Sequence, residues 1–291
     1  MLTARRESRL ANWRAGLDQR AARVAAAWGL TLGAVVADGP ASRLVAVRDR
    51  PLALKLAPPG QGIEAEIAAL RAMAGRGVVA LHRADAAEGA MLLARAMPGI
   101  RLLDLARRDD DAATRIAAEL IAALPGAPPA GMPFAEAAGW GRALVAGTGR
   151  LDPGLLDRAA CELRDLVASA PAPLLLHGDL HHANILRDGD RWAAVDPKGL
   201  LGERAAEAAC LLRNPADAAL LARAPRRAAI IAETAGLDRA GARLGASRRG
   251  HRRLLGGRGR DRPWALAGGG GGAALKAVRR SSRRLWRPPP P

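Results

Sequence analysis

The stretch from Leu174 to Gly199 constrains the fold of this chain more strongly than any other part of the sequence. It reads LLLHGDLHHANILRDGDRWAAVDPKG, in which His177 and Asp179 are followed by Asn184 and then by Asp196. Together these residues form the pattern H-x-D-x-x-x-x-N with a second aspartate downstream. A chain with this pattern needs a short polar loop and a later segment that returns to it.

A β-hairpin is predicted to make that return. Ile185-Leu186 and Trp192–Val195 are short apolar runs, and Asp188-Gly189 between them is a strong signal for a tight turn. Because the hairpin reverses the chain, Asn184 and Asp196 are expected to face one site.

The residue types in this pattern suit phosphoryl transfer. A carboxylate such as Asp179 orients an acceptor hydroxyl and accepts its proton as the O–P bond forms. The Mg²⁺ that accompanies ATP prefers oxygen ligands, such as the amide oxygen of Asn184 and the carboxylate of Asp196. The pattern therefore predicts a kinase catalytic loop followed by a metal-binding aspartate.

Simpler interpretations exist for the separate parts. Asp196, followed by Pro197, is typical of a turn when taken alone. His181 and His182 are compatible with a zinc site, but zinc would not account for Asn184 or for the downstream aspartate. The complete pattern favours the kinase interpretation.

The motifs HGDLHHANIL, AVDPKGLLGE and LLRNP resemble the streptomycin 6-kinase type of the aminoglycoside phosphotransferase family, the aminoglycoside/hydroxyurea antibiotic resistance kinases. The resemblance extends over about residues 25–240 and is most specific in the catalytic region. It implies an α+β, protein-kinase-like fold with two lobes. The N-lobe, residues 1–96, is expected to be small and β-rich, and the C-lobe, residues 97–240, larger and mainly helical.

The resemblance also implies roles for the residues of the pattern. Asp179 corresponds to the catalytic base, and His177 supports the loop. Asn184 and Asp196 correspond to the Mg²⁺ ligands, with ATP as the phosphate donor.

A nucleotide-binding strand is expected at residues 51–57 of the N-lobe. Strand alternation places Ala53 and Lys55 on the face opposite three leucines. Ala53-x-Lys55 matches the kinase strand motif, in which the lysine binds the α- and β-phosphates and the alanine packs over adenine. Lys55 is the first lysine of the chain, and the next is Lys198.

An acidic partner for this lysine is expected on a helix predicted at residues 63–74. Glu66 fits the family helix better, and Glu64 is the alternative. The alternative for either glutamate is a solvated helix face.

A phosphate-covering loop is expected at Asp38–Ser42, where Gly39 would offer its backbone N–H and Ser42 its hydroxyl. The segment departs from a full G-x-G-x-x-G, and a plain β-turn explains it about as well. Adenine is expected at the backbone of residues 94–97, where the two lobes join.

The remaining elements follow from hydrophobic periodicity. Helical spacing occurs in residues 1–30, and two strands are expected around Glu88-Gly89, at Val78–Ala84 and Ala90–Ala96. Met97-Pro98-Gly99 is expected to close the first unit. Further helices are predicted at 111–124, 134–146, 154–169, 203–212, 216–224 and 226–235, with one strand at 173–176.

The acceptor is expected to be a small-molecule aminoglycoside, and the resemblance of residues 199–214 to the streptomycin-kinase pattern favours streptomycin. An aminoglycoside is a polycation, so its pocket should offer carboxylates. Glu203, Glu207 and Asp217 are candidates, although acids on a helix surface are usually only solvated. Another small alcohol or hydroxyurea is the alternative acceptor.

The basic charge of the chain is concentrated in its tail. Of the net charge of +17, residues 241–291 carry +13 and residues 1–240 only +4. The tail is rich in Gly, Arg and Pro and lacks the family pattern, so we expect it to be disordered or the product of a frameshift near residue 240. Catalysis would then be impaired, and the tail would bind nucleic acid only non-specifically.

Cys161 and Cys210 match no metal-ligand spacing and are expected to be buried free thiols. The sequence shows neither an apolar signal-peptide segment nor a run long enough to cross a bilayer. A soluble, cytoplasmic protein with no membrane partner is therefore expected, and the oligomeric state is not indicated.

Overall fold

The computed structural model describes residues 10–39, 42–60, 62–131, 134–136, 172–214 and 218–237. The helix predicted at 154–169, most of the one at 134–146, Cys161, Asp217 and the tail from residue 241 lie outside this part of the chain.

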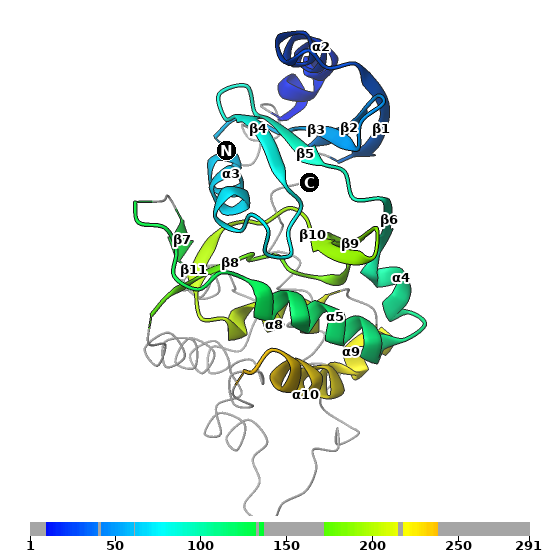
Figure 1. Cartoon of the computed structure of the whole chain (residues 1–291), viewed down its shortest axis with the longest axis vertical. Helices are drawn as coiled ribbons and strands as arrows, with labels where there is room; N and C mark the ends of the chain where they lie inside the picture. The colour runs from blue at the N-terminus through cyan, green and yellow to red at the C-terminus, as the bar shows by residue number, and fades with distance from the viewer. Residues whose placement is uncertain are drawn as a thin grey trace, which may run out of the picture.

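The first half of the described chain forms a five-stranded antiparallel sheet with strand order β1-β2-β3-β5-β4. Two helices accompany it, and Figure 1 shows α2 at the far edge of the molecule and α3 nearer the other lobe. In chain order the elements are α2 (Leu17–Trp28), β1 (Leu32–Asp38), β2 (Arg43–Val47), β3 (Leu52–Leu56), α3 (Ile63–Ala72), β4 (Leu81–Asp85) and β5 (Ala90–Ala94).

The alternation predicted for β3 is confirmed, because its two faces pack differently. Leu54 and Leu56 are fully buried in a cluster with Leu17 and Val24 of α2. Lys55 therefore lies on the opposite face, which is turned toward α3. The other face carries Lys55 beside Met91 and Leu93 of β5, which are buried in the core shared with α3.

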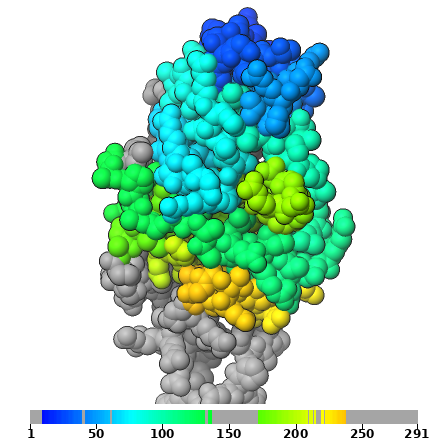
Figure 2. Space-filling view, viewed as in Figure 1, coloured from blue at the N-terminus to red at the C-terminus, as the bar shows by residue number. Residues whose placement is uncertain are grey.

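The second half combines two small sheets with helices. The strand orders are β10-β9-β6 and β7-β11-β8. Figure 2 shows the hairpin of β9 and β10 at the surface, between the five-stranded sheet and α4 and α5. The elements are β6 (Pro98–Arg101), α4 (Leu102–Ala106), α5 (Asp110–Ala123), β7 (Ala135–Glu136), β8 (Leu174–Leu176), a 3₁₀ turn (His182–Asn184), β9 (Ile185–Asp188), β10 (Arg191–Ala194), β11 (Leu200–Gly202), α8 (Ala205–Arg213), α9 (Ala218–Ala222) and α10 (Ala224–Thr234).

Backbone hydrogen bonds join the two halves. The Val79 N–H donates to the Ala194 carbonyl at 3.0 Å, and the Ala194 N–H donates to the Gly77 carbonyl at 2.7 Å. At the linker, the Met97 N–H donates to the Asp188 side chain at 3.2 Å. One apolar core continues from α3 through α5 to α8 and α10. The hairpin of β9 and β10 is thereby held against both halves.

Two segments differ from the sequence-based expectation. The residues after Met97 form β6 and α4 rather than a closing turn, because β6 gains a partner in β9. Ala135 and Glu136, expected in a helix, instead pair in parallel with β11. In both cases a distant strand supplies the backbone hydrogen bonds, and local propensity does not contain that information.

Within the described ranges, no helix combines the length and the apolar character that a membrane crossing requires.

Candidate active site

The loop between β8 and β9 is shaped around His177, which is fully buried. Its Nε2 lies 3.0 Å from the Val195 carbonyl, and its Nδ1 accepts the Asp179 N–H at 3.3 Å. These two contacts assign a neutral ring with the proton on Nε2. Burial lowers the pKa of His177 from 6.5 to about 3, which keeps the ring neutral.

Acidification is expected to destabilise the fold through this histidine. In the unfolded chain His177 takes up a proton near pH 6.5, whereas the folded residue resists protonation down to about pH 3. The unfolded state binds more protons in this window, so the free energy of unfolding falls as the pH falls. The free energy of unfolding is measured with urea at about pH 7.5 and about pH 5. It should decrease less between these pH values in His177→Gln than in the wild type.

The exposed His82 supplies the matched control. His82→Gln should keep the wild-type pH dependence. An unchanged pH dependence in His177→Gln would contradict the role assigned to the buried ring.

Glu207 of α8 anchors the same loop from below. Its side chain is fully buried and accepts a hydrogen bond from the Gly178 N–H at 2.9 Å. Burial raises the pKa of Glu207 to about 7. Gly178 has φ +80°, and a Cβ there would lie 2.8 Å from Leu200, so the turn requires glycine.

The position of Glu207 differs from the expected one. It was a candidate for an acceptor pocket, but its carboxylate is buried beneath the loop, on the Gly178 N–H. Glu203 precedes the same helix, and its carbonyl accepts the Ala206 N–H at 2.9 Å. Asp217 is outside the described residues.

Asp179 is a residue of this loop, and its side chain is only 5% exposed. Asn184 Nδ2 donates to the Asp179 carbonyl at 3.0 Å and lies 3.4 Å from its Oδ2. His181 Nε2 is 3.6 Å and Lys198 Nζ 4.0 Å from the same carboxylate. The loop thus presents one carboxylate surrounded by hydrogen-bond donors.

The hairpin brings Asp196 back beside Asn184. The Val195 N–H donates to the Asn184 carbonyl at 2.9 Å, which joins the two predicted metal ligands through adjacent backbone. Asp196 has φ +61°, a left-handed conformation that is uncommon outside glycine and persists where surrounding contacts hold it.

Lys55 connects this loop to the five-stranded sheet. Its Nζ lies 2.7 Å from Glu66 Oε1 and 2.7 Å from Asp196 Oδ1. Of the two glutamates considered for Lys55, the structure brings Glu66 to the lysine. The side chains of Lys55 and Glu66 are 9% and 12% exposed, whereas that of Asp196 is 33% exposed and open to a ligand.

Burial and charge pairing both shift the pKa values of Lys55, Glu66 and Asp196, and burial is the largest single effect on each. Burial disfavours the lysine ammonium, but the two carboxylates outweigh it and raise the pKa of Lys55. Burial would raise the pKa of Asp196, but the charge of Lys55 outweighs it and the pKa is lowered. For Glu66 burial dominates, and the pKa is raised. Lys55 and Asp196 therefore remain an ion pair.

The turn between β1 and β2 lies at the Lys55 end of the sheet, since Arg43 of β2 pairs with Leu56 of β3. The Gly39 N–H donates to the Ser42 carbonyl at 2.9 Å, so that N–H closes the hairpin itself. The two residues between them are not described.

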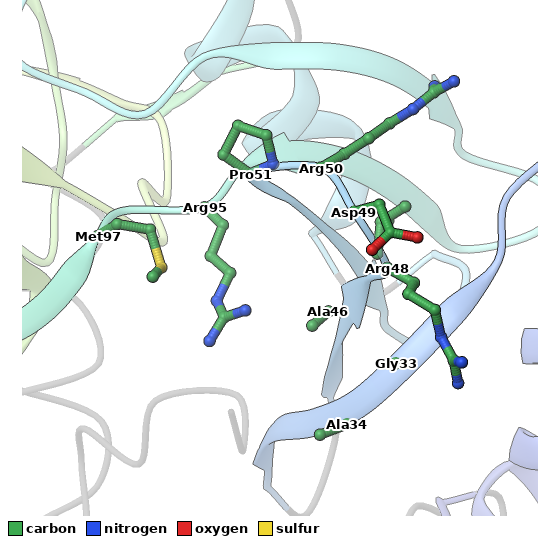
Figure 3. A pocket seen from close by; sticks show the side chains of 10 residues that line it. Gly33, Ala34, Ala46, Arg48, Asp49, Arg50, Pro51, Arg95 and Met97 are labelled. Carbon is green, nitrogen blue, oxygen red and sulfur yellow. The ribbon is translucent and has the colours of Figure 1, made fainter.

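A cavity of about 520 Å³ opens on the sheet next to the linker between the halves. It is lined by Gly33 and Ala34 of β1, Ala46 of β2, and Arg95 and Met97 of the linker, among others. Figure 3 shows the Arg95 side chain extending into the space between Met97 and the sheet. Ala46 pairs with Ala53, which places the cavity on the Lys55 face of the sheet.

Among the described residues, no three or more His, Cys, Asp or Glu side chains are arranged to hold a metal ion. The zinc alternative for His181 and His182 has no such group to support it there. Cys210 is buried, and its Sγ lies 3.7 Å from the Gly178 carbonyl oxygen.

Sequence reasoning did not single out Lys198, although a signal was present. Lys55, Lys198 and Lys276 are the lysines of a chain with 45 Lys and Arg residues. Two of them lie at this site.

The two lobes and the loop between them define a protein-kinase-like fold, and comparison with a solved structure agrees. A thermostable mutant of aminoglycoside phosphotransferase APH(4)-Ia, in ternary complex with ADP and hygromycin B, matches with a TM-score of 0.54. The match covers 90% of this chain and 96% of that chain at 17% sequence identity. The fold is thus α+β and two-lobed, as predicted.

Residues 27–247 match the model of the aminoglycoside/hydroxyurea antibiotic resistance kinase family. The chain belongs to this family.

Two curated relatives support the assignment. A hydroxyurea phosphotransferase from Kitasatospora aureofaciens is 37% identical over 211 residues, which cover 68% of this chain and 62% of the relative. A streptomycin 3''-kinase from Klebsiella pneumoniae is 42% identical over 137 residues, covering 44% of this chain and 49% of the relative. The chain therefore spans about half to three-fifths of the length of the relatives it matches.

Proposed function

We propose that this protein transfers the γ-phosphate of ATP to a hydroxyl of a small acceptor, with streptomycin or a related aminoglycoside as the first candidate. The observation that carries the proposal is the position of Lys55, 2.7 Å from both Glu66 and Asp196, across from the loop that bears Asp179 and Asn184. A lysine, a metal-binding pair and a base are the parts that phosphoryl transfer requires.

The nucleotide is proposed to bind along the face of the sheet that carries Lys55. Its base would occupy the cavity beside Ala46 and Ala53, next to the linker backbone at 94–97. Ala53 and Lys55 are two residues apart, roughly 7 Å along the strand. A base beside Ala53 therefore places its phosphates toward Lys55 and the turn that contains Gly39 and Ser42.

Asn184 and Asp196 have the donor chemistry that Mg²⁺ prefers, an amide oxygen and a carboxylate oxygen. Their neighbouring backbone is joined by the Val195–Asn184 hydrogen bond, and the Asp196 carboxylate is partly exposed. These two residues would hold the ion, which supplies positive charge to the phosphates. Lys55 keeps Asp196 ionised and in place.

Asp179 is proposed to orient the acceptor hydroxyl and to receive its proton. The Asn184 side chain and the neutral His177 ring hold the backbone on both sides of this carboxylate. His177 and Glu207 are fully buried, so these two residues would support the shape of the loop without themselves contacting the acceptor. The chain's own contribution is therefore mainly positioning and charge.

Hydroxyurea is the second candidate acceptor. The longer of the two curated matches is to a hydroxyurea phosphotransferase. In addition, the burial of Glu207 removes one of the carboxylates expected to receive a polycation, which leaves Glu203 and the undescribed Asp217.

An acceptor panel tests the function directly. Incubation with Mg²⁺ and ATP is expected to phosphorylate streptomycin, with hydroxyurea and choline as comparison acceptors, and the products are identified by mass spectrometry. Preference for hydroxyurea would select the second candidate. Nucleotide binding without transfer to any acceptor would instead indicate a catalytically impaired member of the family.

A further inference from the structure

We propose that Lys198 binds the phosphoryl group during its transfer, between Asp179 and Asp196. This inference rests on the proposed function and adds a residue to its machinery.

The backbone around Lys198 is held tightly against the catalytic loop. The Lys198 N–H donates to the His177 carbonyl at 2.7 Å. The next residue, Gly199, has φ +63°, and a Cβ there would lie 2.9 Å from both the Ala65 carbonyl oxygen and the Phe134 ring. Because this segment is packed closely on both sides, the backbone position from which the Lys198 side chain extends is fixed.

The Lys198 side chain extends toward the acceptor side of the site. Its Nζ lies 4.0 Å from Asp179 Oδ2, and the side chain is 27% exposed. Its charge also acts on Asp196 and Glu66. The ammonium therefore lies beside the proposed base and within electrostatic range of Asp196 and Glu66.

This ion pair contributes little to folding. A partly exposed pair whose charged atoms are 4.0 Å apart adds little to the stability of the fold. Among the described residues, Lys198 Nζ forms no hydrogen bond, so its N–H donors remain available for phosphate oxygens. A structural role does not account for this position.

The charge balance of the site supplies the physical reason. Glu66, Asp179 and Asp196 are three carboxylates, and Lys55 pairs with two of them, Glu66 and Asp196. The γ-phosphate is itself anionic and must approach Asp179 closely. A compact ammonium beside that carboxylate reduces its repulsion of the γ-phosphate. A lysine ammonium acts as a point charge, so it needs no bidentate geometry to do this.

Lys198 takes part in the transfer only through its charge. The acceptor oxygen forms a bond to the γ-phosphorus, its proton passes to Asp179, and the bond to the β–γ bridging oxygen breaks. ADP leaves with that electron pair. Lys198 keeps its proton and holds non-bridging oxygens throughout.

The test combines Lys198→Met, which removes the charge, with Lys198→Arg, which retains it. We expect Lys198→Met to lower kcat about 100-fold and to weaken the binding of a non-hydrolysable ATP analogue several-fold. The affinity for ADP should change less than about twofold, because ADP lacks the γ-phosphate that Lys198 is proposed to contact. Lys198→Arg should recover part of both losses. Arg191→Met, at the exposed first residue of β10, is the charge-matched control and should change neither kcat nor the affinity for the analogue.

Calorimetric titration with ADP and with the analogue decides the inference without turnover. Equal weakening of both nucleotides, or no selective loss for the analogue, would overturn it. A rise in acceptor KM alone would also overturn it, since that result places Lys198 on the acceptor. Failure of the wild type to phosphorylate any acceptor would defeat the proposed function, while the two nucleotide affinities would still decide the role of Lys198.

Discussion

Replacing Asp179 with asparagine is expected to lower turnover by about 10²–10⁴-fold, the range for loss of a general base, while ATP still binds. An asparagine keeps the size of the side chain but cannot accept the acceptor's proton. Lys55, Asn184 and Asp196 are untouched, so the nucleotide site stays complete. Steady-state kinetics give kcat, and titration with ATP in the absence of acceptor gives the affinity.

The control for this variant is Asp190→Asn on the hairpin turn, where the carboxylate is fully exposed. It removes the same charge at a distance from the loop and should leave kcat unchanged. Turnover of Asp179→Asn within about tenfold of the wild type would be too high for a lost base. In that case Asp179 is not the proton acceptor.

Arg227→Met is expected to cost about 3–5 kcal/mol of unfolding free energy, because it leaves a buried carboxylate without its partner. Arg227 of α10 is fully buried, and its Nε lies 2.9 Å and 3.0 Å from the two oxygens of Asp110 at the start of α5. Arg223 is 4.0 Å from the same carboxylate but 58% exposed, so it offsets little of the loss. Urea denaturation measures the change.

The neighbouring pair provides a control for this effect. Arg226 bonds Asp111 at 2.8 Å, but its side chain is 61% exposed. Arg226→Met should therefore cost less than about 1 kcal/mol. The double variant Asp110→Ala/Arg227→Met should recover much of the single-variant loss. A loss below about 1 kcal/mol in Arg227→Met would show that the pair does not hold α10 on α5.

Local patterns predicted the parts of the site that depend on neighbouring residues. The Asp188-Gly189 turn and its flanking apolar runs predicted the hairpin that the structure contains. Leucine alternation in β3 placed Lys55 on the face away from α2. Both results follow from backbone geometry over a few residues, which the sequence encodes directly.

The partners of those residues were harder to predict. Glu64 and Glu66 are both acidic residues in the first turn of α3, and only the approach of the helix to β3 brings Glu66 to Lys55. Glu207 was a candidate for the acceptor pocket, and local patterns could not predict its burial, because its contact with Gly178 spans 29 residues of sequence. Whether a carboxylate is exposed or buried depends on what packs over it.

The sequence alone determined which functional groups are present and their local setting. These are a carboxylate, an amide and a second carboxylate around a hairpin, and a lysine on a strand. Tertiary structure decided how these groups are combined, by burying His177 and Glu207 beneath the loop and by placing Lys198 beside Asp179. The reason is that residue type and turn geometry are local properties. Burial and charge pairing depend on segments that meet only when the chain is folded.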